Sequence, residues 1–97
     1  MNIKLEEIEK LLYATPGNRQ WLDLLAPQEI DRFVFLVMEA LSKAEMGSEN
    51  ANFNSINGKF IEYIVKELKE LEDLFGIKNL ASRLNWTQFL KQLYPVT

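Results

Sequence analysis

The chain has 97 residues, 47% of them hydrophobic and 26% charged, with a net charge of −3 and neither cysteine nor histidine. These values predict one small folded domain over residues 1–97 and exclude a disordered chain, a disulfide scaffold and a surface that binds nucleic acid throughout. Because the sequence also has no signal peptide and no run of about 18 apolar residues, we expect a cytoplasmic protein that does not span a membrane.

Two short helices are predicted in the N-terminal quarter of the chain. Apolar residues with helical spacing run through residues 3–13, opposite a face of glutamates and lysine. The turn formers Thr-Pro-Gly-Asn follow at residues 15–18. Asn18 is then expected to cap a second short helix over residues 19–25, which the Ala26-Pro27 step ends.

The stretch of residues 27–44, PQEIDRFVFLVMEALSKA, predicts a long central helix. Pro27 suits the first helical position, and Lys43 in the last turn complements the helix dipole. One apolar stripe faces a partner helix, whereas Phe35 and Met38 point away from that stripe. These two side chains must be covered by the N-terminal helices or by a second subunit.

Residues 46–57, MGSENANFNSIN, predict a polar loop between the two long helices. A loop of about a dozen residues is near the upper limit for an unstructured connection in a small domain. Phe53 either anchors this loop to the core or contacts a partner, and we favour the anchor because a lone aromatic residue usually finds core.

Residues 59–75 predict the second long helix, with apolar residues at successive a and d positions of a heptad. This helix is expected to pack antiparallel to the central helix. Gly76 is expected to end it in the left-handed conformation. Two short helices follow, over residues 78–84 and 86–94, the second of them capped by Asn85.

The charges are unevenly distributed along the chain. Residues 1–75 hold eight of the 11 basic and all 14 acidic side chains, a net charge of −6, and the remainder holds only Lys78, Arg83 and Lys91. We expect the C-terminal segment to dock its basic side on the acidic body of the domain.

The sequence from Leu80 to Gln88, LASRLNWTQ, resembles the core of a helix-turn-helix. It has a Leu-Ala pair, a leucine three residues after the alanine, a turn residue and a threonine that opens a second helix. The resemblance implies DNA binding by residues 79–93, with candidate contacts from Arg83, Thr87, Gln88 and Lys91. The segment departs from the pattern because Lys91 stands where a branched apolar residue belongs, and because base-reading side chains are few.

The residues for common enzyme chemistry are missing from this sequence. Without histidine and cysteine it lacks the usual general bases, nucleophiles and zinc ligands, and it has no glycine-rich phosphate loop or calcium loop. We therefore expect a protein that is not an enzyme and that uses no cofactor, metal or small-molecule substrate.

The sequence therefore predicts an all-α single small domain, an antiparallel pair of long helices with short helices packed at the N- and C-terminal ends. Its expected function is to bind another protein or its own copy as a homodimer, with DNA binding as the alternative. Candidate contact residues for a protein partner are Phe35, Met38 and Phe53. The expected core comprises Leu5, Ile8, Trp21, Leu25, Ile30, Phe33, Val34, Val37, Leu41, Ile61, Ile64, Leu68 and Leu71.

Overall fold

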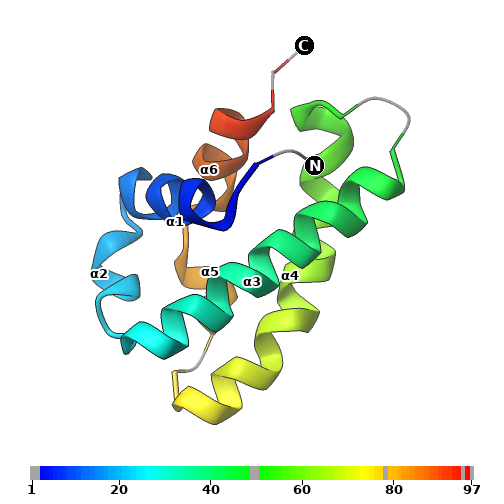
Figure 1. Cartoon of the computed structure of the whole chain (residues 1–97). Coiled ribbons are helices and arrows are strands. Elements are labelled where there is room, and N and C mark those ends of the chain that lie inside the picture. The colour runs from blue at the N-terminus through cyan, green and yellow to red at the C-terminus, as the bar shows by residue number, and fades with distance from the viewer. Residues whose placement is uncertain (1–2, 49–50, 78, 95, 97) are drawn as a thin grey trace.

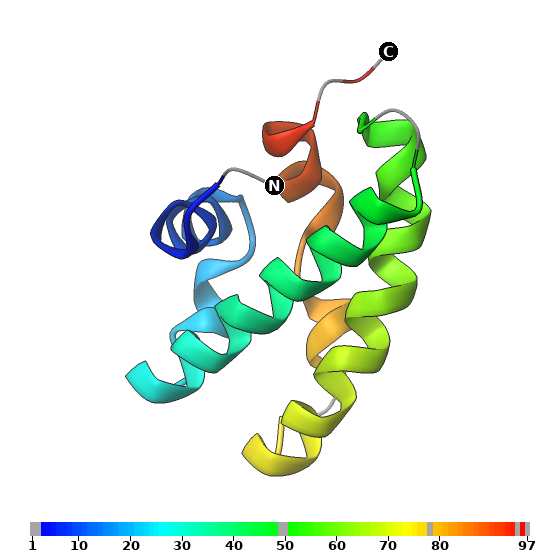
Figure 2. The same cartoon turned by 45° about the vertical axis from the view of Figure 1, so that its right-hand side comes forward.

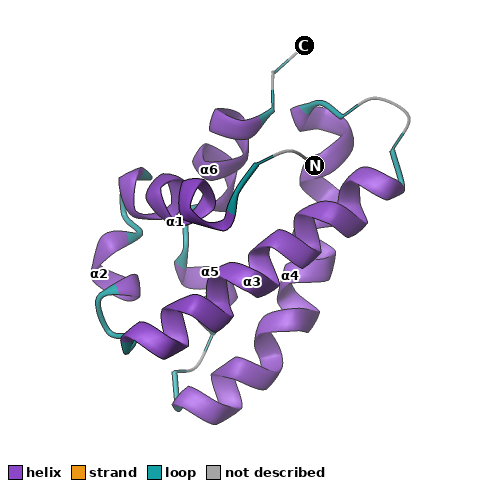
Figure 3. Ribbon diagram, in the orientation of Figure 1, coloured by secondary structure: helices purple, strands orange, loops and turns teal. Residues whose placement is uncertain are grey.

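Helices make up most of the chain in the computed structural model, which describes residues 3–48, 51–77, 79–94 and 96 (Figure 1). Within these ranges there is no β-strand (Figure 3). The radius of gyration is 12.6 Å, close to the value of about 13 Å for one globular domain of 100 residues. The helices are α1 (Leu5–Ala14), α2 (Arg19–Leu22), α3 (Pro27–Met46), α4 (Phe53–Phe75), α5 (Leu80–Arg83) and α6 (Trp86–Leu93).

The two long helices α3 and α4 form the largest interface between elements, and they run antiparallel as predicted. They cross at an angle rather than lying parallel (Figure 2). The short helix α1 packs against α3 and α2 packs against α1, whereas α5 and α6 pack against α4. The predicted all-α architecture is therefore confirmed.

Aromatic side chains from three helices fill the centre of the core. The ring of Trp86, at the start of α6, lies 6.2 Å from that of Phe33 on α3 and 5.2 Å from that of Phe60 on α4. Phe89 lies 5.9 Å from Trp86, one turn further along α6. Edge-on and tilted ring pairs of this kind are favourable at such distances. Helix α6 thus joins the two long helices instead of lying loosely on their surface.

The second long helix begins earlier than the sequence predicted. Asn52 caps α4, because its Oδ1 accepts from the backbone N–H of Ser55 at 3.0 Å and the Ser55 hydroxyl accepts from the backbone N–H of Asn52 at 3.3 Å. Ile56 and Phe60 continue the buried stripe toward this end. The second half of the predicted loop 46–57 is therefore helix, and the connection is shorter than expected.

Several local predictions are confirmed by the backbone and its caps. Gly76 ends α4 with φ of +69°, in the left-handed region. The Asn85 side chain accepts from the backbone N–H of Gln88 at 3.2 Å and caps α6.

Two other local predictions were wrong. Asn18 was expected to cap α2, but its side chain makes no such bond and turns to the C-terminal segment instead. Leu5 was expected in the core, but it is 43% exposed.

Candidate functional site

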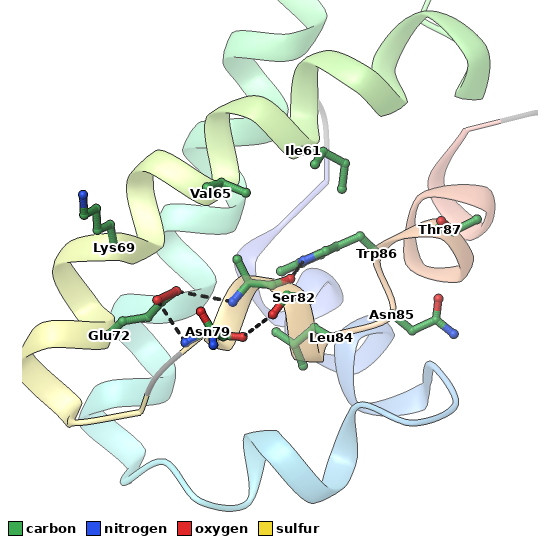
Figure 4. A pocket seen from close by; sticks show the side chains of 11 residues that line it. Ile61, Val65, Lys69, Glu72, Asn79, Ser82, Leu84, Asn85, Trp86 and Thr87 are labelled. Atoms are coloured by element: carbon green, nitrogen blue, oxygen red, sulfur yellow. Dashed lines mark hydrogen bonds between the residues drawn. The ribbon is translucent and has the colours of Figure 1, made fainter.

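A groove lies between α4 and the segment that runs from α5 into the first turn of α6 (Figure 4). Its volume is about 640 Å³. Ile61, Val65, Lys69 and Glu72 are spaced by three or four residues, so α4 presents them along one side of the groove. The opposite side and the base are formed by Asn79, Ala81, Ser82, Leu84, Asn85, Trp86 and Thr87.

Hydrogen bonds to α4 and within the segment hold the groove in shape. The Glu72 carboxylate accepts from the backbone N–H groups of Asn79 at 3.2 Å and of Ala81 at 3.5 Å, where α5 begins. The indole N–H of Trp86 donates to the carbonyl oxygen of Ala81 at 2.6 Å (Figure 4). Because the unpaired N–H groups at a helix start favour a carboxylate, Glu72 ties α5 to α4.

The lining of the groove combines apolar and polar side chains. Val65 is 51% exposed, and Ile61 is partly buried beside it. Lys69 and Glu72 are the ionisable residues of the lining, and Glu72 already accepts hydrogen bonds from the backbone. The groove can therefore hold apolar side chains of a ligand, and Lys69 can meet a carboxylate at its edge.

The sequence did not single out this groove. The expected stripe placed Ile61 in the core and Val65 beside it, although both lie toward the outside of α4. An available signal was Val65, which follows Ile61 by four residues and lies off the line of Ile64, Leu68 and Leu71. The opposite side depends on where α5 packs, and one helical pattern alone does not specify that.

The three candidate contacts for a protein partner differ in exposure. Phe35 is 50% exposed on α3. Met38 is only partly buried and packs against the core. Phe53 also packs against the core, and the Lys91 ammonium lies 5.5 Å from the centre of its ring. Phe53 therefore has the position of an anchor for the start of α4, and Phe35 has the most accessible surface of the three.

All four candidate DNA contacts are exposed, but the two basic side chains among them lie against two different aromatic rings. The Arg83 guanidinium lies over the ring of Trp21, 4.4 Å from its centre. Lys91 lies over Phe53, and Thr87 lines the groove. Helix α5, the first of the two helices in the segment that resembles a helix-turn-helix, has four residues.

The turn at residues 15–18 packs against α6 and occupies one side of the helix that the resemblance assigns to DNA. The side-chain amide of Asn85 donates to the carbonyl oxygen of Pro16 at 3.3 Å, and that of Gln92 donates to the Thr15 hydroxyl at 2.9 Å. Thr15 and Asn18 are buried there. The C-terminal segment thus docks on the body through amides, hydroxyls and aromatic rings, whereas docking of its basic side on acidic residues was expected. Lys78 lies outside the described residues.

Comparisons with protein-family models, with curated proteins and with solved structures gave no significant match. Within the described residues, none of the helices has both the length and the apolar character that crossing a membrane requires. In the same part of the chain, no three Asp or Glu side chains gather as a metal site would need.

Proposed function

We propose that this chain is a small non-enzymatic protein that acts by binding another protein, with the groove between α4 and the α5–α6 segment as its docking surface. The observation that supports the proposal is the half-exposed Val65 in a preformed, mostly apolar groove of about 640 Å³. Concave apolar surfaces with a few polar groups at the rim are the usual form of peptide and ligand sites.

The proposed occupant is an amphipathic segment of a partner protein that carries apolar side chains and one carboxylate. The apolar side chains would cover Ile61 and Val65. The carboxylate would lie against Lys69, because Glu72 is held by the backbone N–H groups of α5. We further propose that the protein works in the cytoplasm, which the absence of cysteine supports, and that it also associates with its own copy through α3.

Affinity capture from the source cells tests the groove, with the bound proteins identified and then titrated individually. Val65→Glu places a carboxylate at the centre of the groove and is expected to lower the affinity of the captured partner at least tenfold. Leu24→Glu is the matched control, because Leu24 is 62% exposed and does not line the groove. Binding that survives Val65→Glu unchanged contradicts the proposed site.

The same capture tests the alternative function of DNA binding. Recovery of DNA without a stoichiometric protein, with retention that weakens steeply as salt rises, would favour that alternative. In that case Lys91→Ala should reduce the dependence of binding on salt, because a lysine that contacts phosphate releases counterions.

A further inference from the structure

Phe35 lies at the middle of the exposed face of α3. At 100° per residue, the exposed or partly exposed positions of this helix form one arc that contains Arg32, Phe35, Glu39 and Ser42. The buried positions, on the other side of the helix, are Ile30, Phe33, Val34, Val37, Ala40, Leu41 and Ala44. An aromatic side chain of α3 is therefore directed to the outside, among polar neighbours.

Opposite charges stand at nearly equal distances before and after Phe35. Arg32 precedes it by about 4.5 Å along the helix axis, and Glu39 follows it by about 6 Å, since each residue adds about 1.5 Å. Around the helix, both lie on the same side of Phe35 as Lys43, which forms an ion pair with Glu67 of α4 at 2.6 Å. Neither Arg32 nor Glu39 forms an ion pair within 4.0 Å of a described residue, although the Glu39 carboxylate acts electrostatically on Lys43, one turn further along α3.

The Lys43–Glu67 ion pair joins the outer side of α3 to α4. Leu74, near the end of α4, is another exposed apolar side chain, with 65% of its surface accessible.

We infer that two copies of this chain associate through this face, with α3 of one copy antiparallel to α3 of the other and a two-fold axis beside Phe35. A two-fold axis brings the residue before Phe35 in one copy to the residue after it in the other. Arg32 of each copy then meets Glu39 of the second copy, so that two ion pairs flank the two Phe35 rings.

The charge pattern favours a second copy over an unrelated partner as the occupant of this face. An antiparallel pair sets Arg32 of each copy against Glu39 of the other, whereas a parallel pair would set Arg32 against Arg32 and Glu39 against Glu39. This inference deepens the self-association proposed above and rests on it. The inference does not depend on the groove, which is lined by residues of α4 and of the α5–α6 segment and not by residues of α3.

Analytical ultracentrifugation of the full chain at about 100 μM tests the inference. The wild type is expected to sediment as a dimer, and Phe35→Glu as a monomer with an unchanged circular dichroism spectrum. Arg32→Glu and Glu39→Arg should each be monomeric, because each sets like charges against each other in a homodimer. Lys69→Glu, which changes the net charge by the same amount as Arg32→Glu but lies in the groove, should remain a dimer.

Restoration of the dimer by a second charge change is the decisive measurement. An equimolar mixture of Arg32→Glu and Glu39→Arg is expected to form a heterodimer, and the double variant R32E/E39R should again form a homodimer. A wild type that stays monomeric at about 100 μM overturns the self-association itself, while Val65→Glu still tests the groove. A wild-type dimer that the paired charge changes fail to restore overturns the antiparallel arrangement of α3.

Discussion

The backbone N–H of Asn85 donates a 2.6 Å hydrogen bond to the side-chain Oδ1 of Asn18, which lies 67 residues earlier in the sequence. Asn18 is fully buried, so water does not replace this acceptor in the folded state. The bond joins the turn between α1 and α2 to the residue that caps α6. This bond thereby fixes the N- and C-terminal parts of the chain to each other.

Asn18→Ala is expected to lower the free energy of unfolding by about 1–3 kcal/mol, because it leaves the Asn85 N–H without its acceptor. Urea denaturation followed by circular dichroism measures the change. Gln20→Ala, at an exposed position in α2, is the control and should stay within about 0.5 kcal/mol of the wild type. Equal losses in the two variants would mean that the Asn18–Asn85 bond adds little to stability.

Substitutions of two leucines on α4 test which side of this helix packs against α3. Leu68 is fully buried and Leu74 is largely exposed. Leu68→Ala should cost about 2–5 kcal/mol, because it removes apolar contacts and leaves a cavity. Leu74→Ala should change the free energy of unfolding by less than about 0.5 kcal/mol. Similar values for the two would contradict the orientation of α4.

Most of the architecture could be predicted because it depends on local patterns. The spacing of Ile64, Leu68 and Leu71 determines which side of α4 is buried, and Gly76 determines where the helix ends. The start of α4 was missed because asparagine and serine favour both loops and helix caps. In Asn52-Phe53-Asn54-Ser55 the three-residue spacing of Asn52 and Ser55 was the signal for a cap.

The candidate site could not be predicted in the same way, because its two sides come from different parts of the chain. Periodicity assigns Ile61 to the core stripe of α4 and Val65 to the flank of that stripe, yet both line the groove. Whether they are covered depends on the packing of a four-residue helix, α5, which the Glu72 carboxylate holds in place. A hydrogen bond between a side chain and a distant backbone N–H produces no periodic pattern in the sequence.

The helix cap at Asn52 gives a prediction about the beginning of α4. Asn52→Ala should lower the free energy of unfolding by about 0.5–2 kcal/mol, since the backbone N–H of Ser55 loses its acceptor. Asn52→Asp and Asn52→Ser keep a capping oxygen and should remain close to the wild type. If all three variants unfold at the same urea concentration, the cap does not stabilise α4.

Tyr94 predicts how stability depends on pH in the alkaline range. Burial raises the pKa of its phenol above the usual value, and so does the hydrogen bond that the hydroxyl donates to the Glu45 carboxylate at 2.7 Å. The unfolded chain ionises this phenol near pH 10, whereas the folded chain keeps it neutral. The stability that neutral Tyr94 contributes is therefore complete below about pH 10 and is lost as the pH rises further.

Between about pH 9 and pH 11, urea denaturation should show that the free energy of unfolding declines less steeply with pH for Tyr94→Phe than for the wild type. Part of the decline should remain, because burial also raises the pKa of Tyr13. Tyr63→Phe, at a partly buried tyrosine of α4, is the control for loss of a phenol and should decline as the wild type does. Parallel curves for wild type and Tyr94→Phe would contradict the assigned role of Tyr94.

Trp86 gives the last prediction, because one side chain joins three helices and also lines the groove. Trp86→Phe removes the indole N–H that donates to the buried carbonyl oxygen of Ala81, and it leaves space between Phe33 and Phe60. We expect a loss of about 1–3 kcal/mol in the free energy of unfolding from the unpaired carbonyl alone. Trp21→Phe, at the partly buried tryptophan that Arg83 covers, is the matched control and should cost less.

Fluorescence of the two variants separates the tryptophans: Trp86, only 5% exposed, should emit at shorter wavelength than Trp21 and shift more on unfolding. Emission from Trp86 at the wavelength of a solvent-exposed indole would contradict its position between α3, α4 and α6.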